Sequence, residues 1–191
     1  MFKNLMIATA LFSSFSIFAA TETLNVDTTA SKVVWTGKKI TGSSHTGELK
    51  LSNGTLKFNG ETLTGGEFTV DMKTLTNTDI ENPEYNKKLV GHLTSDDFFS
   101  IAKFPTAKFV IKSAKKTTGN KYAITGDLTV KGKTAPITFD ADVTKTASTG
   151  VVKFDRTVYD VKYNSGKFFQ ALGDNLINDE VELSVNLTTK K

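Results

Sequence analysis

Apolar and polar residues alternate along most of this chain in short runs, and a period of two is typical of a β-strand with one buried face. The runs extend from Ser31 to Leu187 and are separated by turn signals such as Asn59-Gly60, Thr118-Gly119-Asn120 and Lys131-Gly132-Lys133. This spacing of short strands and turns is typical of an all-β domain. The pattern predicts about eight strands and gives no sign of a second domain.

One turn signal stands inside a strongly alternating segment. Asn53-Gly54 lies between the run Thr46–Leu51 and a second run that contains Leu56 and Phe58. Asn-Gly is the dipeptide most typical of a two-residue β-hairpin, because both of its residues tolerate a positive φ. We therefore predict a hairpin at Asn53-Gly54, with separate strands before and after it.

Two segments lack the alternation. Thr74–Lys88 is polar and contains Asn82-Pro83, so we predict a loop there. Arg156–Asn178 combines glycines with several aromatic residues in no regular order, and we predict an irregular connection.

A short helix is predicted after the first of these segments, over residues 94–102. Thr94 and Ser95 are favourable N-cap residues, and Asp96 and Asp97 would place negative charge in the first turn. Pro105 would stop the helix because it has no amide proton to donate. The spacing i, i+3, i+4 gives this helix one apolar face, formed by Phe98, Ile101 and Ala102.

The consecutive hairpins favour a single antiparallel up-and-down β-barrel with the short helix near its mouth, although alternation alone also permits a sandwich. A barrel of about eight strands is either filled by side chains or holds one small ligand. The small inward residues Gly47, Ala107, Gly126 and Ala141 leave volume in the interior. Large inward aromatic residues reduce this volume, so the pattern does not decide between a hollow and a filled interior. These residues are Trp35, Phe58, Phe68, Phe109 and Phe139.

The N-terminal segment, residues 1–20, resembles a secretory signal peptide. Lys3 supplies a positive start, Leu5–Phe18 is an apolar run, and Ala19-Ala20 offers small residues for cleavage. The run is too short, and too often interrupted by serines, to be a good membrane span, which needs about 20 apolar residues. We expect cleavage, export and a mature domain over 21–191 without a membrane span, and keep an uncleaved anchor as the alternative.

Composition narrows the chemistry that the chain can perform. It has no cysteine, which excludes disulfides and thiolate metal sites. Its net charge is +4, but its basic residues are lysines spread along the strands, with Arg156 as the single arginine. A nucleic-acid surface usually clusters its charge and uses more arginine, so nucleic acid is not an expected partner.

Few residues point to catalysis. His45 and His92 lack the spacing of metal ligands, and we predict no metal and no cofactor. Gly132-Lys133-Thr134 resembles the end of a phosphate-binding loop, but strands flank it on both sides. Asp96 and Asp97 would not face each other on a helix. We therefore predict a binding protein and no enzyme, with an enzyme acting on a lipid headgroup at the barrel mouth as one alternative.

An apolar interior suits a long alkyl or isoprenoid chain, because each buried methylene contributes about 0.8 kcal/mol without any polar contact. The polar head would lie at the mouth near Arg156, Tyr159, Tyr163 and His92. For Arg156, a structural ion pair with Asp160 is as good an interpretation as a contact with the polar head of the ligand. We predict that the ligand contacts the following residues: Val33, Trp35, Leu49, Phe58, Phe68, Val70, Leu93, Phe98, Phe99, Phe109, Ile111, Leu128, Val130, Phe139, Phe154, Arg156, Tyr159, Phe169 and Leu183.

Several longer motifs together resemble the YceI-like family. In the first two thirds of the chain these are Gly65–Leu75, His92–Phe99, Lys103–Phe109 and Gly126–Thr134; in the last third they are Phe154–Gly166 and Leu172–Leu183. The resemblance covers nearly the whole mature chain. One departure is Asp160, where the family pattern leads us to expect glycine. This difference affects the expected local turn and not the expected fold.

The resemblance implies a lipocalin-like barrel that holds a polyisoprenoid or similar amphiphilic lipid. It also implies a periplasmic location and a homodimer, and it implies no shared catalytic residues. Storage, transport and sequestration of the lipid all fit such a protein. A filled barrel that works through its outer surface is the remaining alternative.

Overall fold

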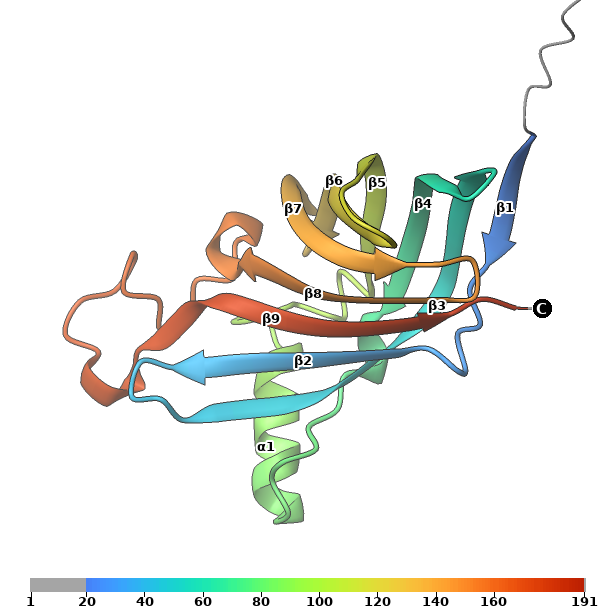
Figure 1. Ribbon diagram of the computed structural model, residues 1–191. Helices are drawn as coiled ribbons and strands as arrows, with labels where there is room; N and C mark the ends of the chain where they lie inside the picture. The colour runs from blue at the N-terminus through green and yellow to red at the C-terminus, as the bar shows by residue number, and fades with distance from the viewer. Residues whose placement is uncertain (1–19, 191) are drawn as a thin grey trace, which may run out of the picture.

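The computed structural model describes residues 20–190 (Figure 1). The predicted signal peptide, residues 1–20, lies outside the described residues except for Ala20. None of the helices in the described range is long and apolar enough to cross a membrane. The strands are β1 (Thr21–Asn25), β2 (Lys32–Lys39), β3 (Ser44–Asn59), β4 (Thr62–Asp71), β5 (Thr106–Lys116), β6 (Lys121–Val130), β7 (Lys133–Val143), β8 (Ala147–Asp155) and β9 (Ile177–Thr188). The helices are α1 (Pro83–Thr94) and the short 3₁₀ turns η1 (Met72–Thr74), η2 (Arg156–Tyr159) and η3 (Gly173–Asn175).

Eight of the strands close into an antiparallel barrel. From β2 to β9 each strand pairs with the next one along the chain, and β9 pairs back with β2. This is the up-and-down order that the consecutive turns predicted, and the sandwich alternative is wrong. The strand β1, which the alternation did not reveal, lies outside the barrel and pairs with residues 55–59 of β3.

The predicted hairpin at Asn53-Gly54 is wrong, because β3 runs unbroken through it. The register with β4 shifts between Leu51 and Asn53, which marks a β-bulge. The extra residue moves the buried positions from Leu49 and Leu51 to Leu56 and Phe58. Gly54 itself faces inward, and a Cβ there would lie 2.9 Å from the Cβ of Val26. Close packing, not a turn, therefore requires this glycine.

The helix is also not where we predicted it. It spans Pro83–Thr94, inside and beyond the segment predicted as a loop, and Ser95 caps its C-terminus instead of its N-terminus. The side chain of Asn82 accepts hydrogen bonds from the backbone N–H groups of Glu84 and Tyr85 at 3.0 and 3.2 Å. With Pro83 in the first turn, these are standard helix-start signals.

Residues 95–104 form successive turns instead of the predicted helix. Ser100 adopts a positive φ of 51°, and its carbonyl accepts hydrogen bonds from the N–H groups of Lys103 and Phe104. Phe98 and Ile101 are buried as the predicted apolar face required, whereas Ala102 is exposed. The apolar spacing therefore identified buried side chains but not their backbone conformation.

The connections differ at the two ends of the barrel. One end has the short turns β3–β4, β5–β6 and β7–β8, at residues 60–61, 117–120 and 144–146. The other end has the long β4–β5 connection, which contains α1, and the long β8–β9 connection, which contains η2 and η3. Figure 1 shows the β8–β9 connection and the β2–β3 turn together at the left of the barrel. We call these the short-turn end and the long-loop end.

The wall of the barrel is thinnest between β7 and β8. These strands pair only over residues 141–143 and 148–150, and beyond that point η2 packs beside β7. Asp160 follows η2 in the left-handed conformation, with φ 62° and ψ 27°. This explains why the family pattern led us to expect glycine at Asp160, since aspartate is among the few other residues that tolerate this conformation.

Candidate functional site

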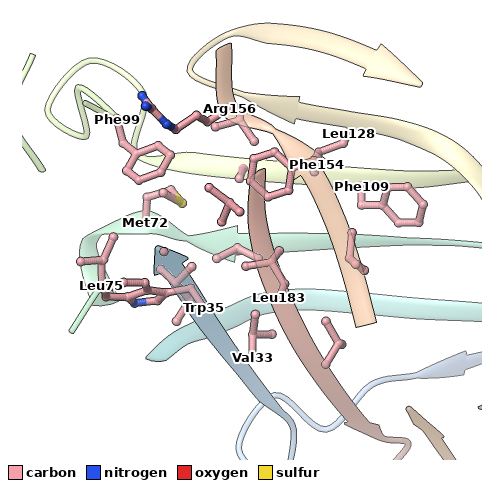
Figure 2. Close-up of a pocket in the computed structure, with 18 of the residues that line it drawn as sticks. Val33, Trp35, Met72, Leu75, Phe99, Phe109, Leu128, Phe154, Arg156 and Leu183 are labelled. Carbon is pink, nitrogen blue, oxygen red and sulfur yellow. The ribbon is translucent and has the colours of Figure 1, made fainter. Parts of the chain in front are cut away.

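A cavity of about 450 Å³ lies inside the barrel. This volume falls within the range of small-molecule sites. Figure 2 shows apolar side chains from several strands pointing into it, with Trp35 and Leu75 at one side and Phe109 at another. Of the two interiors between which the alternation did not decide, the structure has the hollow one, even though five aromatic rings were expected to face inward.

Most residues that we predicted as ligand contacts line this cavity. Most have the inward orientation that their strand alternation indicated; Leu93 lies in α1, Phe98 and Phe99 lie in the turns after it, and Arg156 begins η2. They are Val33, Trp35, Leu49, Phe68, Val70, Leu93, Phe98, Phe99, Phe109, Ile111, Leu128, Val130, Phe139, Phe154, Arg156 and Leu183.

Three predicted contacts do not line the cavity. Phe58 follows the β-bulge and packs at the short-turn end, where its side chain is 1% exposed. Tyr159 is equally buried, but its ring packs edge-to-face on Phe154 with centroids 5.5 Å apart. Phe169 lies on the β8–β9 connection and is 47% exposed. Alternation alone does not separate a residue that lines a cavity from one that plugs the end of the barrel.

Sequence reasoning also missed residues that line the cavity. Met72 and Leu75 belong to η1 and the turn after it, and Leu89 belongs to α1. Met72 continues the alternation of β4, so that signal was present, whereas Leu75 lies in the segment predicted as a loop and Leu89 lies just after it. Their contribution depends on how the β4–β5 connection folds back onto the barrel.

Most of the polar residues that line the cavity gather at the long-loop end, which we therefore identify as its mouth. They come from the end of β2 and the turn after it, from the start of β3, from α1, from the β8–β9 connection and from the start of β9. They are Lys38, Lys39, Ser43, His45, His92, Arg156, Tyr163, Asn164, Asn175 and Asn178. The cavity thus has a polar end and an apolar body.

Arg156 is the most deeply buried charged group at the mouth, at 1% exposure. Its guanidinium donates to the carbonyls of Asn178, Val161 and Ile177 at 3.1, 2.8 and 3.1 Å. Its Nη2 lies 3.4 Å from Oδ1 of Asp179. These contacts tie η2 to the start of β9, so Arg156 has a clear structural role in holding the rim together.

The ion pair that we considered for Arg156 has a different partner. Asp160 pairs with Lys162, at 2.6 Å, and Asp179 takes its place beside the guanidinium. Burial lowers the pKa of Arg156, and the charges of Asp179 and Asp155 partly offset this effect. Arg156 also lines the cavity, and its guanidinium carbon lies 6.0 Å from the centre of the Phe98 ring.

An aromatic cluster surrounds His92 beside Arg156. The imidazole packs edge-to-face against Phe98 and Tyr163, with centroids 5.0 and 4.5 Å apart. Its Nε2 lies 3.7 Å from Oδ2 of Asp97. His92 and Tyr163, two of the four polar groups that we predicted at the mouth, are therefore in direct contact there.

His45 has an orienting carboxylate on the opposite side of the mouth. Its Nδ1 lies 2.8 Å from Oδ2 of Asp79, and Oδ1 of Asp79 accepts from the N–H of Thr46 at 2.8 Å. Burial opposes ionisation of Asp79, but the hydrogen bonds from Thr46, His45 and Asn77 outweigh it and hold the pKa of Asp79 below its usual value. Within residues 20–190 no three histidine, aspartate or glutamate side chains are grouped to hold a metal ion.

A buried hydroxyl interrupts the apolar body of the cavity. Ser148, at the start of β8, lines the cavity and is 6% exposed. Its Oγ has no hydrogen-bond partner among residues 20–190. The next residue, Thr149, also lines the cavity near the short-turn end but is exposed.

The chain is similar to several proteins of known sequence or structure. Residues 24–189 match the YceI-like domain. A UPF0312 protein of Pseudomonas fluorescens (strain SBW25) is 35% identical over 138 residues, which are 72% of this chain and 69% of that protein. BcnA of Burkholderia cenocepacia has a crystal structure with a TM-score of 0.68 and 25% identity, covering 86% of this chain and 99% of BcnA.

A second solved structure supports the same fold at lower identity. It is a polyisoprenoid binding domain from Saccharophagus degradans, implicated in plant cell wall breakdown. Its TM-score is 0.62 at 17% identity, and the match covers 91% of this chain and 98% of that domain.

Proposed function

Because this chain belongs to the YceI-like family, we propose that it is a binding protein for a polyisoprenoid or a similar long-chain amphiphile. The observation that carries the proposal is the closed barrel with a cavity of about 450 Å³ whose body is apolar and whose mouth is polar. An amphiphile has the same distribution of apolar and polar groups. The Saccharophagus degradans domain shares the fold and is described as polyisoprenoid binding, which adds support.

The proposed mechanism is binding by burial. The chain of the ligand lies along Val33, Leu128 and Leu183, and each methylene that leaves water contributes about 0.8 kcal/mol. The head remains at the mouth beside Arg156 and His92, where hydrogen-bonding groups are available. No step in this mechanism makes or breaks a covalent bond, so the protein stores, carries or sequesters its ligand.

Export to the periplasm and a homodimeric state are further proposals. Export is supported by the signal-like pattern of residues 1–20 and would place the barrel where an amphiphile moves through an aqueous compartment. Cell fractionation with an intact mass measurement of the mature protein tests export, since cleavage near Ala20 removes a defined mass. Light scattering coupled to size-exclusion chromatography tests the homodimer.

The experiment that tests ligand binding is extraction. The protein is purified without detergent from a host that makes isoprenoid lipids, extracted with organic solvent, and analysed by mass spectrometry. We expect one long-chain amphiphile in close to equimolar amount. The matched control is the double variant Leu128→Trp, Leu183→Trp, which fills the cavity from two facing strands and should carry several-fold less lipid. A wild-type protein that yields no long-chain lipid refutes the proposal.

A further inference from the structure

The β8–β9 connection forms a projecting loop beside the mouth of the cavity. The N–H of Ile177 donates to the carbonyl of Asn164 at 2.9 Å and closes residues 165–176 into a loop. Both closing residues line the cavity, so the loop stands directly at its opening. Figure 1 shows this orange-red loop extending beyond the strands at the left of the barrel.

The loop and its neighbour expose large apolar side chains. Phe168 and Phe169 are 49% and 47% exposed, and Ile40, in the turn after β2, is 64% exposed. The N–H of Ile40 donates to the carbonyl of Leu176 at 3.1 Å, which joins the β2–β3 turn to the same loop. We call Ile40, Phe168 and Phe169 the rim patch. Adjacent aromatic rings held in water at a cavity mouth are unfavourable unless another apolar phase receives them.

Lysines surround the rim patch. Lys38 and Lys39 precede Ile40, are exposed, and have no carboxylate partner among residues 20–190. Nζ of Lys162 lies 5.0 Å from the centre of the Phe168 ring. Acidic residues are also present: Asp160 is paired with Lys162, and Asp174 in the same loop is exposed and has no ion pair among residues 20–190. The surface next to the exposed aromatic rings therefore offers unpaired positive charge on one side, contributed by β2.

From these observations we propose that the rim patch docks the barrel mouth on the surface of a bilayer that contains anionic lipids. Aromatic and aliphatic side chains enter the boundary between headgroups and acyl chains, while lysines bind lipid phosphates. A docked mouth lets a hydrophobic chain pass between bilayer and cavity without crossing water. This inference rests on the proposed lipid-binding function and adds the partner with which the lipid is exchanged.

A bilayer accounts for the composition of the patch better than a protein partner does. The apolar groups form a narrow projection next to the opening, with lysines behind them, which matches shallow insertion into a charged interface. Exposed hydrophobic residues elsewhere, such as Tyr85 on α1 and Val151 on β8, are not at the mouth. They provide the internal controls for the experiment.

The test is sedimentation with vesicles of phosphatidylethanolamine and phosphatidylglycerol at 3:1, compared with phosphatidylcholine vesicles. We expect wild-type protein to bind the anionic vesicles and the double variant Phe168→Ser, Phe169→Ser to bind at least fivefold more weakly. The control Tyr85→Ser should bind like wild type. The double variant Lys38→Gln, Lys39→Gln should lose binding to the anionic vesicles only, and high salt should weaken wild-type binding.

The same preparations are extracted to measure bound lipid, which separates failure of the docking proposal from failure of the proposed function. If wild type carries lipid but does not bind vesicles, or if the phenylalanine variant binds as well as wild type, docking is refuted and lipid binding stands. If wild type binds vesicles but carries no lipid, the proposed lipid-binding function is refuted and docking on the bilayer stands. A concentration-dependent dimer that only the phenylalanine substitutions abolish would assign the patch to a second copy of this chain and overturn the proposal.

Discussion

The short-turn end and the long-loop end of this barrel are built from the same alternating strands, yet their interiors differ. At the short-turn end Leu56, Phe58, Leu63 and Tyr122 are all buried to within 2% and pack together. The hydroxyl of Tyr122 accepts from the N–H of Leu63 at 3.2 Å and so locks the start of β4. At the long-loop end the strands surround a cavity with a polar mouth.

This difference shows that the connections at each end determine where the cavity lies in the barrel. Tight turns bring strand ends together, and large side chains from β3, β4 and β6 then fill the space between them. Long connections cannot fill the other end as completely, and they supply polar rim residues such as Arg156 and His92. The cavity therefore has its polar mouth at one end and a packed plug of apolar side chains at the other.

The largest effect is expected from damage to the plug. Phe58→Ala should lower the free energy of unfolding by about 3–5 kcal/mol, because it leaves a cavity in a fully packed cluster. Phe109→Ala in the lipid-free protein should cost about half as much, since that ring already borders open volume. Urea denaturation of both variants measures the contrast. Equal losses would show that the two ends are packed alike.

Arg156→Met tests the rim. The change leaves three carbonyls without their hydrogen-bond donor and Asp179 without the guanidinium beside it, and it should lower the free energy of unfolding by about 3 kcal/mol. Limited proteolysis should then cut within 165–176 before the strands, because the loop has lost its tie to β9. Stability close to that of wild type, together with weaker lipid binding, would assign Arg156 to the ligand instead of the fold.

Added bulk should have opposite consequences at the two ends. Leu63→Trp forces a larger ring into the plug and should cost about 1–3 kcal/mol of stability without changing the lipid content. Leu128→Trp places the same ring in open volume, so lipid content should fall while the free energy of unfolding changes by less than about 1 kcal/mol. Thermal denaturation and lipid extraction on the same samples separate the two effects.

Two serines give a smaller contrast. The hydroxyl of Ser148 lacks a protein partner, so Ser148→Ala should raise the free energy of unfolding by about 1 kcal/mol by removing a buried polar group. Ser165 accepts a hydrogen bond from the N–H of Lys167 at 3.2 Å, so Ser165→Ala should lower it by about 1 kcal/mol. Denaturation midpoints check both signs. A Ser148→Ala variant that instead loses lipid would show that the hydroxyl contacts the ligand.

The smallest expected effect is the response of the long-loop end to acid. Burial raises the pKa of Asp155, but hydrogen bonds from Lys167 and Thr157 outweigh it and keep this pKa below its ordinary 3.8. The folded state therefore binds this proton less tightly than the unfolded chain, and the resulting stability is complete above pH 3.8 and is lost as the pH falls through the lowered pKa.

Asp155→Asn should accordingly reduce stability at neutral pH and flatten its decline below pH 3.8. Thermal midpoints measured between pH 7 and pH 2.5 check this. Asp174→Asn is the control, since Asp174 is exposed on η3 and has no ion pair among residues 20–190. An unchanged pH profile for Asp155→Asn would show that the carboxylate does not contribute.

Some features of this protein were determined by the sequence because they depend on neighbouring residues only. A period of two assigns each side chain to one face of a strand, so the inward positions of Val33, Trp35 and Leu128 followed directly. The turn at Lys131-Gly132-Lys133 also formed as predicted, with positive φ values of 48° at Lys131 and 72° at Gly132. The helix start at Asn82-Pro83 was visible too, but the competing cap residues at 94–97 led us to the wrong segment.

Other features were decided only by the tertiary structure, because they depend on residues far apart in the chain. The bulge in β3 arises where its pairing with β4 has to keep both Leu51 and Leu56 inside, and alternation within one strand does not show it. Arg156 forms its ion pair with Asp179 instead of Asp160, which is nearer in the sequence, because β9 returns beside η2. Whether the interior is hollow depends on the summed volume of side chains from all eight barrel strands once the barrel is closed, a quantity that no local pattern contains.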